Sequence, residues 1–310
     1  MRYDFICFKN IRYLFLGASM IIVLLLITGC DSDDDDDSTK MKLLAIEYAN
    51  GAFVAVGQDY LISNSADSEE FYEQYRDGAG SLQTVCFGNG IWLTAGTSGI
   101  IFTSIDTANW FAQSLDTTRT LYGSVYGDGI YIIVGERGEI VRSTNSGAWA
   151  FIDVETKKTL FDVAFGDDGF LAVGKEGTIL RSVNGMHWET VKAGITQNLL
   201  GVGWGAGQYV VVGKKGAIFT SDHGAAWSSV YSPVEKDLFD VVYGKNQFVA
   251  VGAKGTILTS QDAVNFYAQD SDTGQDLYSV TCDGSQYIAV GRNEKIIKSF
   301  DGITWTTIKR

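Results

Sequence analysis

Leu160–Trp188 reads LFDVAFGDDGFLAVGKEGTILRSVNGMHW, and the same pattern recurs along most of the chain. Its apolar run FLAVG ends at Gly174, and steps of 39 residues from this position reach a glycine every time. The glycines in this series are Gly57, Gly96, Gly135, Gly174, Gly213, Gly252 and Gly291. A fixed period between about 20 and 50 residues is the signature of a repeat architecture. We therefore expect seven copies of one structural unit.

The spacing inside the unit is that of strands rather than helices. Residues 160–165 alternate between two faces and are followed by Gly and Asp turn residues. A second run, 170–173, leads through the tight turn 175–177 to a third run at 178–182. After a loop, a fourth strand opens at Trp188. Short β-rich runs separated by Gly, Asn and Asp predict a four-stranded antiparallel meander.

One such sheet cannot be stable alone. Burial of an apolar side chain contributes about 1.5–3 kcal/mol, whereas ordering each residue costs about 1.5 kcal/mol. The sheets must therefore pack face to face, and twisted identical sheets close naturally into a ring. The sequence predicts an all-β fold, a seven-bladed β-propeller over residues 41–310. Because the last repeat ends with its own fourth strand, Trp305–Lys309, we expect no strand shared between the termini.

The N-terminal segment has the features of a secretory signal. Residues 1–12 carry Arg and Lys, and residues 13–27 are mostly apolar. The segment ends in Ile27-Thr28-Gly29-Cys30, which resembles the bacterial lipobox. The resemblance implies cleavage after residue 29 and a diacylglyceryl group on Cys30, and hence a lipid anchor in place of a membrane span. An ordinary signal-anchor helix is the alternative.

Residues 30–40 are expected to form an acidic tether between the lipid and the propeller. This segment contains the run Asp33–Asp37, and a block of like charge stays extended. We therefore expect localisation to the bacterial cell envelope, periplasm-facing or at the cell surface, with the choice between inner and outer membrane left open. Calcium binding by the Asp run is the less favoured interpretation.

Charge and cysteine content limit the partners. The chain has 37 Asp and Glu against 24 Lys and Arg, a formal net charge of −13, which argues against nucleic acid. Apart from Cys7 in the leader and Cys30, only Cys86 and Cys282 are present. Both lie on first strands, and we expect free, buried thiols.

The loop before the fourth strand resembles the Asp-box of bacterial neuraminidase-type repeats. Its last copy is Ser299-Phe300-Asp301-Gly302-Ile303-Thr304-Trp305, and the Ser and the aromatic residue recur in every repeat. A short polar side chain at the third position can bind backbone amides of its own turn. The other copies are SADSEEF (65–71), SIDTANW (104–110), STNSGAW (143–149), SVNGMHW (182–188), SDHGAAW (221–227) and SQDAVNF (260–266). The resemblance implies a fold rather than a catalytic activity.

The complete repeat is similar to the propellers of photosystem II assembly factors and their non-photosynthetic bacterial relatives. The similar pattern is a G-x-G-x-aromatic segment followed by AVG-x-x-G-x-I-x-x-S-x-D-G-x-x-W, and it covers all seven repeats. This resemblance favours a protein that assists the assembly of a complex, although propellers host many unrelated activities.

Enzymatic chemistry finds little support in the sequence. Sialidases carry an Arg-Ile-Pro opening and six repeats, whereas the one proline here is Pro233. Asp162 and Asp240 share one repeat position and are candidates for the carboxylate pair of a glycosidase. The same position holds small or polar residues in the other repeats, which favours a solvated strand entry. His187 and His223, the two histidines, are expected to be exposed loop residues, and no metal or cofactor is predicted.

The turn between the second and third strands carries the strongest functional signal. In a propeller these turns share one face with the segments that link the blades. Repeats three to seven place basic residues there, on a protein that is acidic overall. A cationic sector can attract an acidic protein or an anionic glycan. The candidate residues are Arg137, Lys175, Lys214, Lys215, Lys254 and Arg292. The alternative is that Lys and Glu are simply common in exposed turns.

The sequence therefore favours a non-enzymatic protein-interaction or complex-assembly module that is anchored to a membrane through Cys30. The alternative is a propeller that binds or cleaves an extracellular polysaccharide. A cleft with exposed aromatic residues would favour the alternative, but the aromatic residues that recur in every repeat are expected to form the core.

Overall fold

The computed structural model describes residues 7–8, 11–12, 41–78 and 80–308. The chain divides into two compact units, Met1–Thr39 and Lys40–Arg310. In the first unit β1 (Cys7–Phe8) pairs with β2 (Ile11–Arg12). Cys30 and the acidic tether lie outside the described residues. Among the described residues, no helix is long and apolar enough to cross a membrane.

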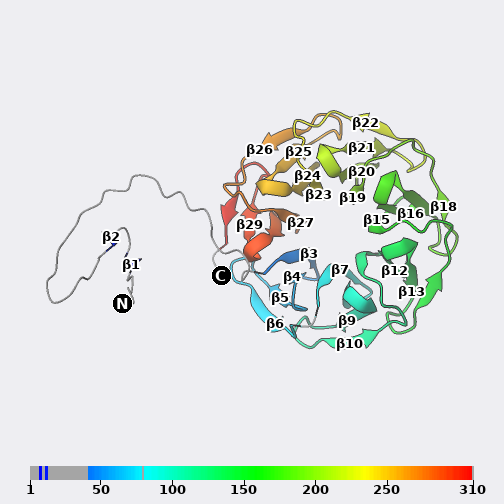
Figure 1. The fold of residues 1–310 in the computed structure, drawn as a ribbon, viewed down its shortest axis with the longest axis horizontal. Helices are drawn as coiled ribbons and strands as arrows, with labels where there is room; N and C mark the ends of the chain where they lie inside the picture. Colours follow the sequence, from blue (N-terminus) through cyan, green and yellow to red (C-terminus); the bar gives the residue numbers. More distant parts are fainter. Residues whose placement is uncertain (1–6, 9–10, 13–40, 79, 309–310) are drawn as a thin grey trace, which may run out of the picture. The chain divides into compact units, whose positions relative to one another are not determined.

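The second unit is a ring of seven four-stranded sheets (Figure 1), so the predicted seven-bladed β-propeller is confirmed. Blade four shows the unit: β15 (Leu160–Gly166), β16 (Gly169–Gly174), β17 (Ile179–Ser182) and β18 (Glu189–Thr190) pair in that order, all antiparallel. The fourth strand begins one residue later than expected, because Trp188 packs under the hairpin with the core residues of blades three and four.

The other six blades repeat this order. Blade one has β3 (Leu43–Ala49), β4 (Ala52–Gly57), β5 (Ile62–Ser65) and β6 (Tyr72–Tyr75). Blade two has β7 (Leu82–Gly88), β8 (Ile91–Gly96), β9 (Ile100–Ser104) and β10 (Phe111–Ser114). Blade three has β11 (Leu121–Gly127), β12 (Ile130–Gly135), β13 (Ile140–Ser143) and β14 (Ala150–Ile152).

Blades five to seven complete the ring. Blade five has β19 (Leu199–Gly205), β20 (Gln208–Gly213), β21 (Ile218–Ser221) and β22 (Ser228–Val230). Blade six has β23 (Leu238–Gly244), β24 (Gln247–Gly252), β25 (Ile257–Ser260) and β26 (Tyr267–Gln269). Blade seven has β27 (Leu277–Cys282), β28 (Tyr287–Gly291), β29 (Ile296–Ser299) and β30 (Thr306–Thr307).

A short 3₁₀ turn joins the second and third strands of blades two to seven. These turns are η1 (Thr97–Gly99), η2 (Glu136–Gly138), η3 (Lys175–Gly177), η4 (Lys214–Gly216), η5 (Ala253–Gly255) and η6 (Arg292–Glu294). In a meander these turns and the segments between blades lie at the same end of the strands, which we call the turn face. The Asp-box-like loops lie at the opposite end, the loop face.

No strand is shared between the termini, as predicted, because blades one and seven are each built from consecutive strands. The ring closes instead through side chains and one core. The hydroxyl of Ser279 accepts the Ile46 amide at 3.3 Å, and the hydroxyl of Thr281 accepts the Tyr48 amide at 3.2 Å. A shared apolar cluster joins the two blades, with Phe53 from blade one and Ile288 from blade seven.

The core lies between successive blades rather than inside any one of them. Ile132 and Val134 of blade three, for example, form one cluster with Leu160 and Phe170 of blade four. The recurring aromatic residue of the second strand is fully buried in every blade: Phe53, Trp92, Tyr131, Phe170, Tyr209, Phe248 and Tyr287. The expectation that these aromatic residues form the core is confirmed.

The Asp-box-like loops are held by hydrogen bonds within the loop. In blade seven Asp301 Oδ1 accepts the amides of Ile303 and Thr304, both at 2.8 Å, and the Ser299 hydroxyl at 3.0 Å. The indole of Trp305 donates to the Gly302 carbonyl at 2.9 Å. In blade two a hydrogen bond from the Asn109 side chain, together with the bonds from the amides of Asn109 and Ala108, lowers the pKa of Asp106 to about 2. The loops fasten the hairpin to the core.

Candidate functional site

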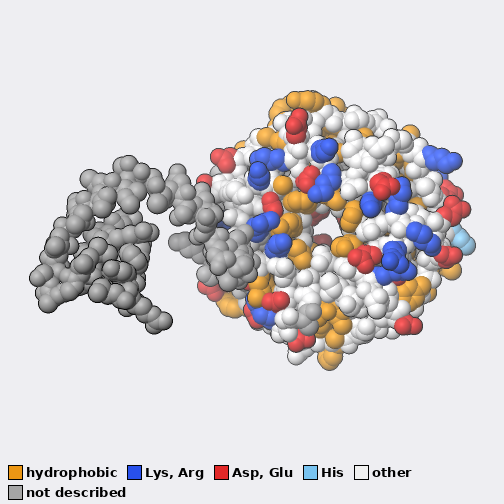
Figure 2. Space-filling view, in the orientation of Figure 1, with side chains coloured by type: hydrophobic (Ala, Val, Ile, Leu, Met, Phe, Trp, Pro, Cys, Tyr) orange, Lys and Arg blue, Asp and Glu red, His pale blue; other side chains and the backbone are white. Residues whose placement is uncertain are grey.

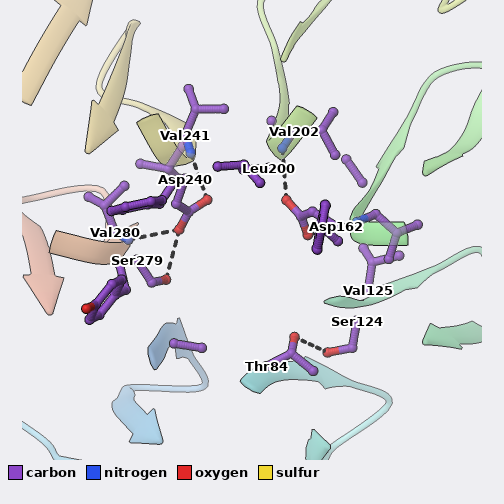
Figure 3. A pocket seen from close by; sticks show the side chains of 18 of the residues that line it. Thr84, Ser124, Val125, Asp162, Leu200, Val202, Asp240, Val241, Ser279 and Val280 are labelled. Atoms are coloured by element: carbon purple, nitrogen blue, oxygen red, sulfur yellow. Dashed lines mark hydrogen bonds between the residues drawn. The ribbon is translucent and has the colours of Figure 1, made fainter. Parts of the chain in front are cut away.

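The first strands of the seven blades form the wall of an axial channel with a volume of about 750 Å³. Figure 3 looks into this cavity and shows Asp162 and Asp240 on its wall with Leu200 between them, and Thr84 and Ser124 on another part of the wall. Each first strand contributes the residues that directly follow its buried leucine. The chemistry of the channel is therefore set by two consecutive repeat positions.

The first of these positions forms an aromatic collar, by which we mean Tyr122, Phe161, Phe239 and Tyr278. All four side chains are half-buried. Tyr122 and Phe161 meet edge to face with ring centroids 5.6 Å apart, and Phe239 and Tyr278 lie 5.5 Å apart. Such pairs form rigid apolar surfaces with a large contact area. The remaining blades place Leu44, Gln83 and Leu200 at this position.

The second position carries the two aspartates, and each of them joins two blades. Asp162 Oδ1 accepts the amide of its neighbour Val163, and Oδ2 accepts the amide of Val202 in blade five, both at 2.8 Å. Asp240 Oδ2 accepts the Val280 amide of blade seven at 2.9 Å and the Ser279 hydroxyl at 2.8 Å. These carboxylates satisfy amides that the ring would otherwise leave without a strand partner.

The interpretation of this position as a solvated strand entry is therefore wrong. Both aspartates are half-buried in the channel wall, and both oxygens of each carboxylate accept hydrogen bonds. Glycines make room for them: a Cβ on Gly123 would lie 2.7 Å from Asp162 Cα, and one on Gly201 would lie 2.8 Å from Asp240 Cα. The contacts favour a role in joining blades over that of a glycosidase pair.

Burial shifts the titration of the channel carboxyl groups. Burial raises the pKa of Asp162 to about 8, and the nearby Asp240 carboxylate adds to the shift, while the two amide hydrogen bonds oppose it. Burial likewise raises the pKa of Glu47 to about 7 and that of Asp240 above its usual range. These carboxyl groups therefore hold protons in the folded protein at a pH where they would lose them when unfolded.

Stability is accordingly expected to fall as the pH rises from about 4 to about 8. Because the folded state binds more protons than the unfolded state in this interval, the free energy of unfolding decreases with pH. Thermal unfolding followed at pH 5 and pH 8.5 should give the lower midpoint at pH 8.5. Asp162→Asn should narrow the difference between the two unfolding midpoints. This variant therefore distinguishes the effect of the channel carboxyl groups from that of the overall charge of −13. A midpoint that does not fall with pH would contradict this expectation.

The structure places the predicted basic residues on the 3₁₀ turns of the turn face. Hydrogen bonds from η4 and η5 to the following linkers show that turns and linkers share this face, as at Lys215 and Lys254, whose amides bind Asp237 and Asp276 at 2.9 Å. Lys214 pairs with Asp237 at 2.6 Å, and Arg292 pairs with Asp276 at 2.9 Å. The linker aspartates thus offset part of the positive charge.

The remaining basic residues are more accessible. Arg137, Lys215 and Lys254 are exposed and form no ion pair within the described part of the chain. Lys175 lies 3.9 Å from Glu176, with about half of its side chain exposed. On the face drawn in Figure 2, Lys and Arg side chains surround the central opening, with Asp and Glu among them. The turn face is mixed in charge, and its basic groups stand near the channel mouth.

The histidines lie on exposed loops of the loop face, as expected. His223 Nδ1 lies 2.8 Å from Asp168 Oδ2, and His187 lines the same groove, whose volume is about 700 Å³. Nowhere among the described residues do three His, Cys, Asp or Glu side chains converge as metal ligands. The contact between His223 and Asp168 joins blades five and four across this groove.

Both cysteines of the propeller are free thiols, as predicted. Burial raises the pKa of Cys86 to about 12, so this thiol is unreactive. The expectation of burial is wrong for Cys282, which is half-buried, because it ends the first strand of blade seven at the rim of the channel.

Sequence reasoning missed the aromatic collar. The signal was present, since four of the seven residues that follow the first-strand leucine are aromatic. Unlike the core aromatic residues, these do not recur in every repeat, which is why a search for strict periodicity passes over them. Blades one, two and five have no aromatic residue at this position, which shows that packing of the blades does not require one there.

No protein-family model and no curated protein sequence matches the chain. Several solved structures, in contrast, are similar to the propeller. YCF48 bound to D1 peptide aligns with a TM-score of 0.70 at 18% identity, over 86% of this chain and 93% of that one. A catalytically inactive virginiamycin B lyase from Staphylococcus aureus with quinupristin aligns at 0.74 and 13% identity, over 84% and 94%.

The WD40 propeller domain of Doa1 aligns at a TM-score of 0.67 and 13% identity, covering 85% of this chain and 95% of that domain. Identities this low establish a shared propeller fold and nothing finer. The similar structures include a propeller with a bound peptide and a lyase, so the shared fold by itself fixes no function.

Proposed function

We propose that this protein is a lipid-anchored propeller of the bacterial cell envelope that binds a segment of a partner protein at the turn face. One observation carries the proposal: the aromatic collar lies in the mouth of the channel, with the basic residues of the 3₁₀ turns around it. Large aromatic side chains and Arg are the residue types that dominate protein-binding energies. Surrounding basic groups would speed the approach of an acidic partner.

The chemistry of the channel supports binding rather than catalysis. The carboxylates that a glycosidase would need are each tied to the ring wall by an amide of a neighbouring blade. YCF48 has been solved with a bound peptide, which shows that a propeller of this fold can hold a peptide segment. A glycan stacked on the collar is the alternative, and it becomes an outcome of the test below.

Charge reversal on the turn face should weaken capture of the partner. The acyl-free propeller, residues 41–310, and its variant Lys214→Glu/Lys215→Glu/Lys254→Glu are each used to capture proteins from envelope extract, and captured proteins are identified and rebound in purified form. We expect at least a tenfold weaker affinity for the variant, because the three introduced glutamates would repel an acidic partner that the lysines attract. Rim charges act mainly on the association rate and the salt dependence.

A matched control reverses three basic residues that lie away from the turn face, Arg142, Arg181 and Lys245. This control has the same net charge as the variant and should bind like the unmodified propeller. Equal losses in both variants would reduce the effect to net charge and contradict the proposed site. Binding of purified envelope glycan, with no protein partner, would favour the polysaccharide alternative.

A further inference from the structure

The interior of the axial channel is a second place where a ligand fits. The cavity of about 750 Å³ is within the size range of small-molecule sites in proteins. It begins at the aromatic collar and continues past the carboxylates to residues such as Val125 and Thr281 (Figure 3). A central channel is common to propellers, and the aromatic rings and carboxyl groups that line this one give it a chemistry of its own.

The walls of this cavity carry acidic groups that the chain does not balance with basic ones. Glu47, Asp162 and Asp240 all line it. Among the described lining residues the only Lys or Arg is Lys214, and its ammonium group is engaged by Asp237 at 2.6 Å. Uncompensated carboxylates in a confined space either keep a proton or attract a cation.

The hydrogen bonds leave acceptor positions for a ligand on both oxygens of Asp162 and on Oδ1 of Asp240. Each carboxylate oxygen has two acceptor positions. Asp162 uses one at each oxygen for the amides of Val163 and Val202, so the others remain for a donor inside the cavity. The two amides also fix the orientation of the Asp162 carboxylate, so its free acceptor positions are held in place for a ligand.

The aromatic collar adds a second and independent attraction for a cation. Ring faces attract ammonium and guanidinium groups, by about 0.5–1 kcal/mol at exposed sites and about 2 or more where water is excluded. Two ring pairs, one from blades three and four and one from blades six and seven, border the cavity entrance. A cation that entered there would pass between aromatic rings before it reached the carboxylates.

We propose that the axial cavity binds one organic cation, an ammonium or a guanidinium group, with Asp162 and Asp240 as its hydrogen-bond acceptors and the aromatic collar as its entrance. A metal ion fits less well, because no three ligand side chains of the described residues converge. The cation can belong to a Lys or Arg side chain of a bound protein segment or to a free amine. The site shares the aromatic collar with the proposed partner-binding surface, but it can be tested on the propeller alone.

Calorimetric titration of the purified propeller tests this site. The probes are agmatine, the tripeptide acetyl-Gly-Arg-Gly-amide, and N-butylurea as a neutral control of similar shape. We expect both cations to bind and butylurea not to bind. Tighter binding of the tripeptide would indicate a protein side chain as the natural occupant, whereas tighter binding of agmatine would indicate a free amine.

Two variants locate the site. Asp162→Asn/Asp240→Asn should weaken agmatine binding at least tenfold, because an amide keeps the side-chain shape but cannot lose a proton to become the carboxylate that a cation binds. Phe239→Leu/Tyr278→Leu leaves the carboxylates in place and should weaken it about threefold or more through lost cation–π contact. Equal binding of agmatine and butylurea, unchanged affinity in the aspartate variant, or no binding of either cation at millimolar concentration would overturn the proposal. Because no partner protein is present, its failure is distinct from failure of the turn-face proposal.

Discussion

Gly201→Val is expected to destabilise the propeller by about 3 kcal/mol, the upper end of the range for overpacking. Gly201 lies on the first strand of blade five, where the backbone of blade six approaches closely. A Cβ there would lie 2.7 Å from the Phe239 carbonyl oxygen and 2.8 Å from Asp240 Cα. Both obstacles are backbone atoms, which cannot rotate away. The two blades would have to separate, and the Asp240 bonds to blade seven would be strained as well.

Chemical denaturation followed by tryptophan fluorescence measures this effect. Gly274→Val is the matched control, because Gly274 is exposed, has no positive φ angle and has no atom within 4 Å of an added Cβ. The control should change the free energy of unfolding by less than about 0.5 kcal/mol. If both variants are equally stable, blades five and six do not approach each other as the structure has them.

Cys30→Ala is expected to remove all incorporation of fatty acid into the protein. The proposed lipid anchor needs the Cys30 thiol as the site of acylation. Acyl chains stabilise membrane attachment by about 0.8 kcal/mol per buried CH₂ group, so several chains anchor a protein without a membrane span. Cells grown with an alkyne fatty acid give the measurement, since labelled protein can be visualised after coupling to a dye.

The matched control for this variant is Cys7→Ala. Cys7 lies within the expected signal peptide, residues 1–29, so its loss should leave the label unchanged. The intact mass of the labelled protein should correspond to a chain that starts at residue 30. The lipid anchor would be removed from the proposed function if the fatty-acid label persisted in Cys30→Ala. It would also be removed if the protein without any substitution incorporated no label.

The fold could be predicted from the sequence because one physical constraint is repeated in every unit. The glycine that ends the second strand, Gly174 in blade four, has a counterpart at every step because a Cβ there would lie 2.2 Å from the Thr159 carbonyl oxygen. Trp188 and its counterparts recur because in each blade this side chain packs between the hairpin of the third and fourth strands and the core. Constraints of packing act on all blades alike, so they appear as a period.

The candidate site was only partly predictable, because its residues occur in some repeats and not in others. The basic residues of the 3₁₀ turns were found by their charge, yet their pairing with Asp237 and Asp276 depends on how linkers fold back over the turns. Asp162 was noticed as a carboxylate, but its contact with Val202 spans 40 residues and two blades. Phe161 and Phe239 look like ordinary strand residues until the ring places them at the mouth of a channel.

Site-specific photo-cross-linking tests the central proposal most directly, which is that a partner protein binds at the mouth of the channel on the turn face. A benzophenone amino acid is placed at Phe239 in the aromatic collar or, as a control, at the exposed Phe300 on the loop face. We expect irradiation of intact envelopes to give one discrete adduct from position 239, which is lost in the Lys214→Glu/Lys215→Glu/Lys254→Glu background, and none from position 300. An adduct of equal yield from position 300, or no protein adduct from position 239, would contradict the proposal.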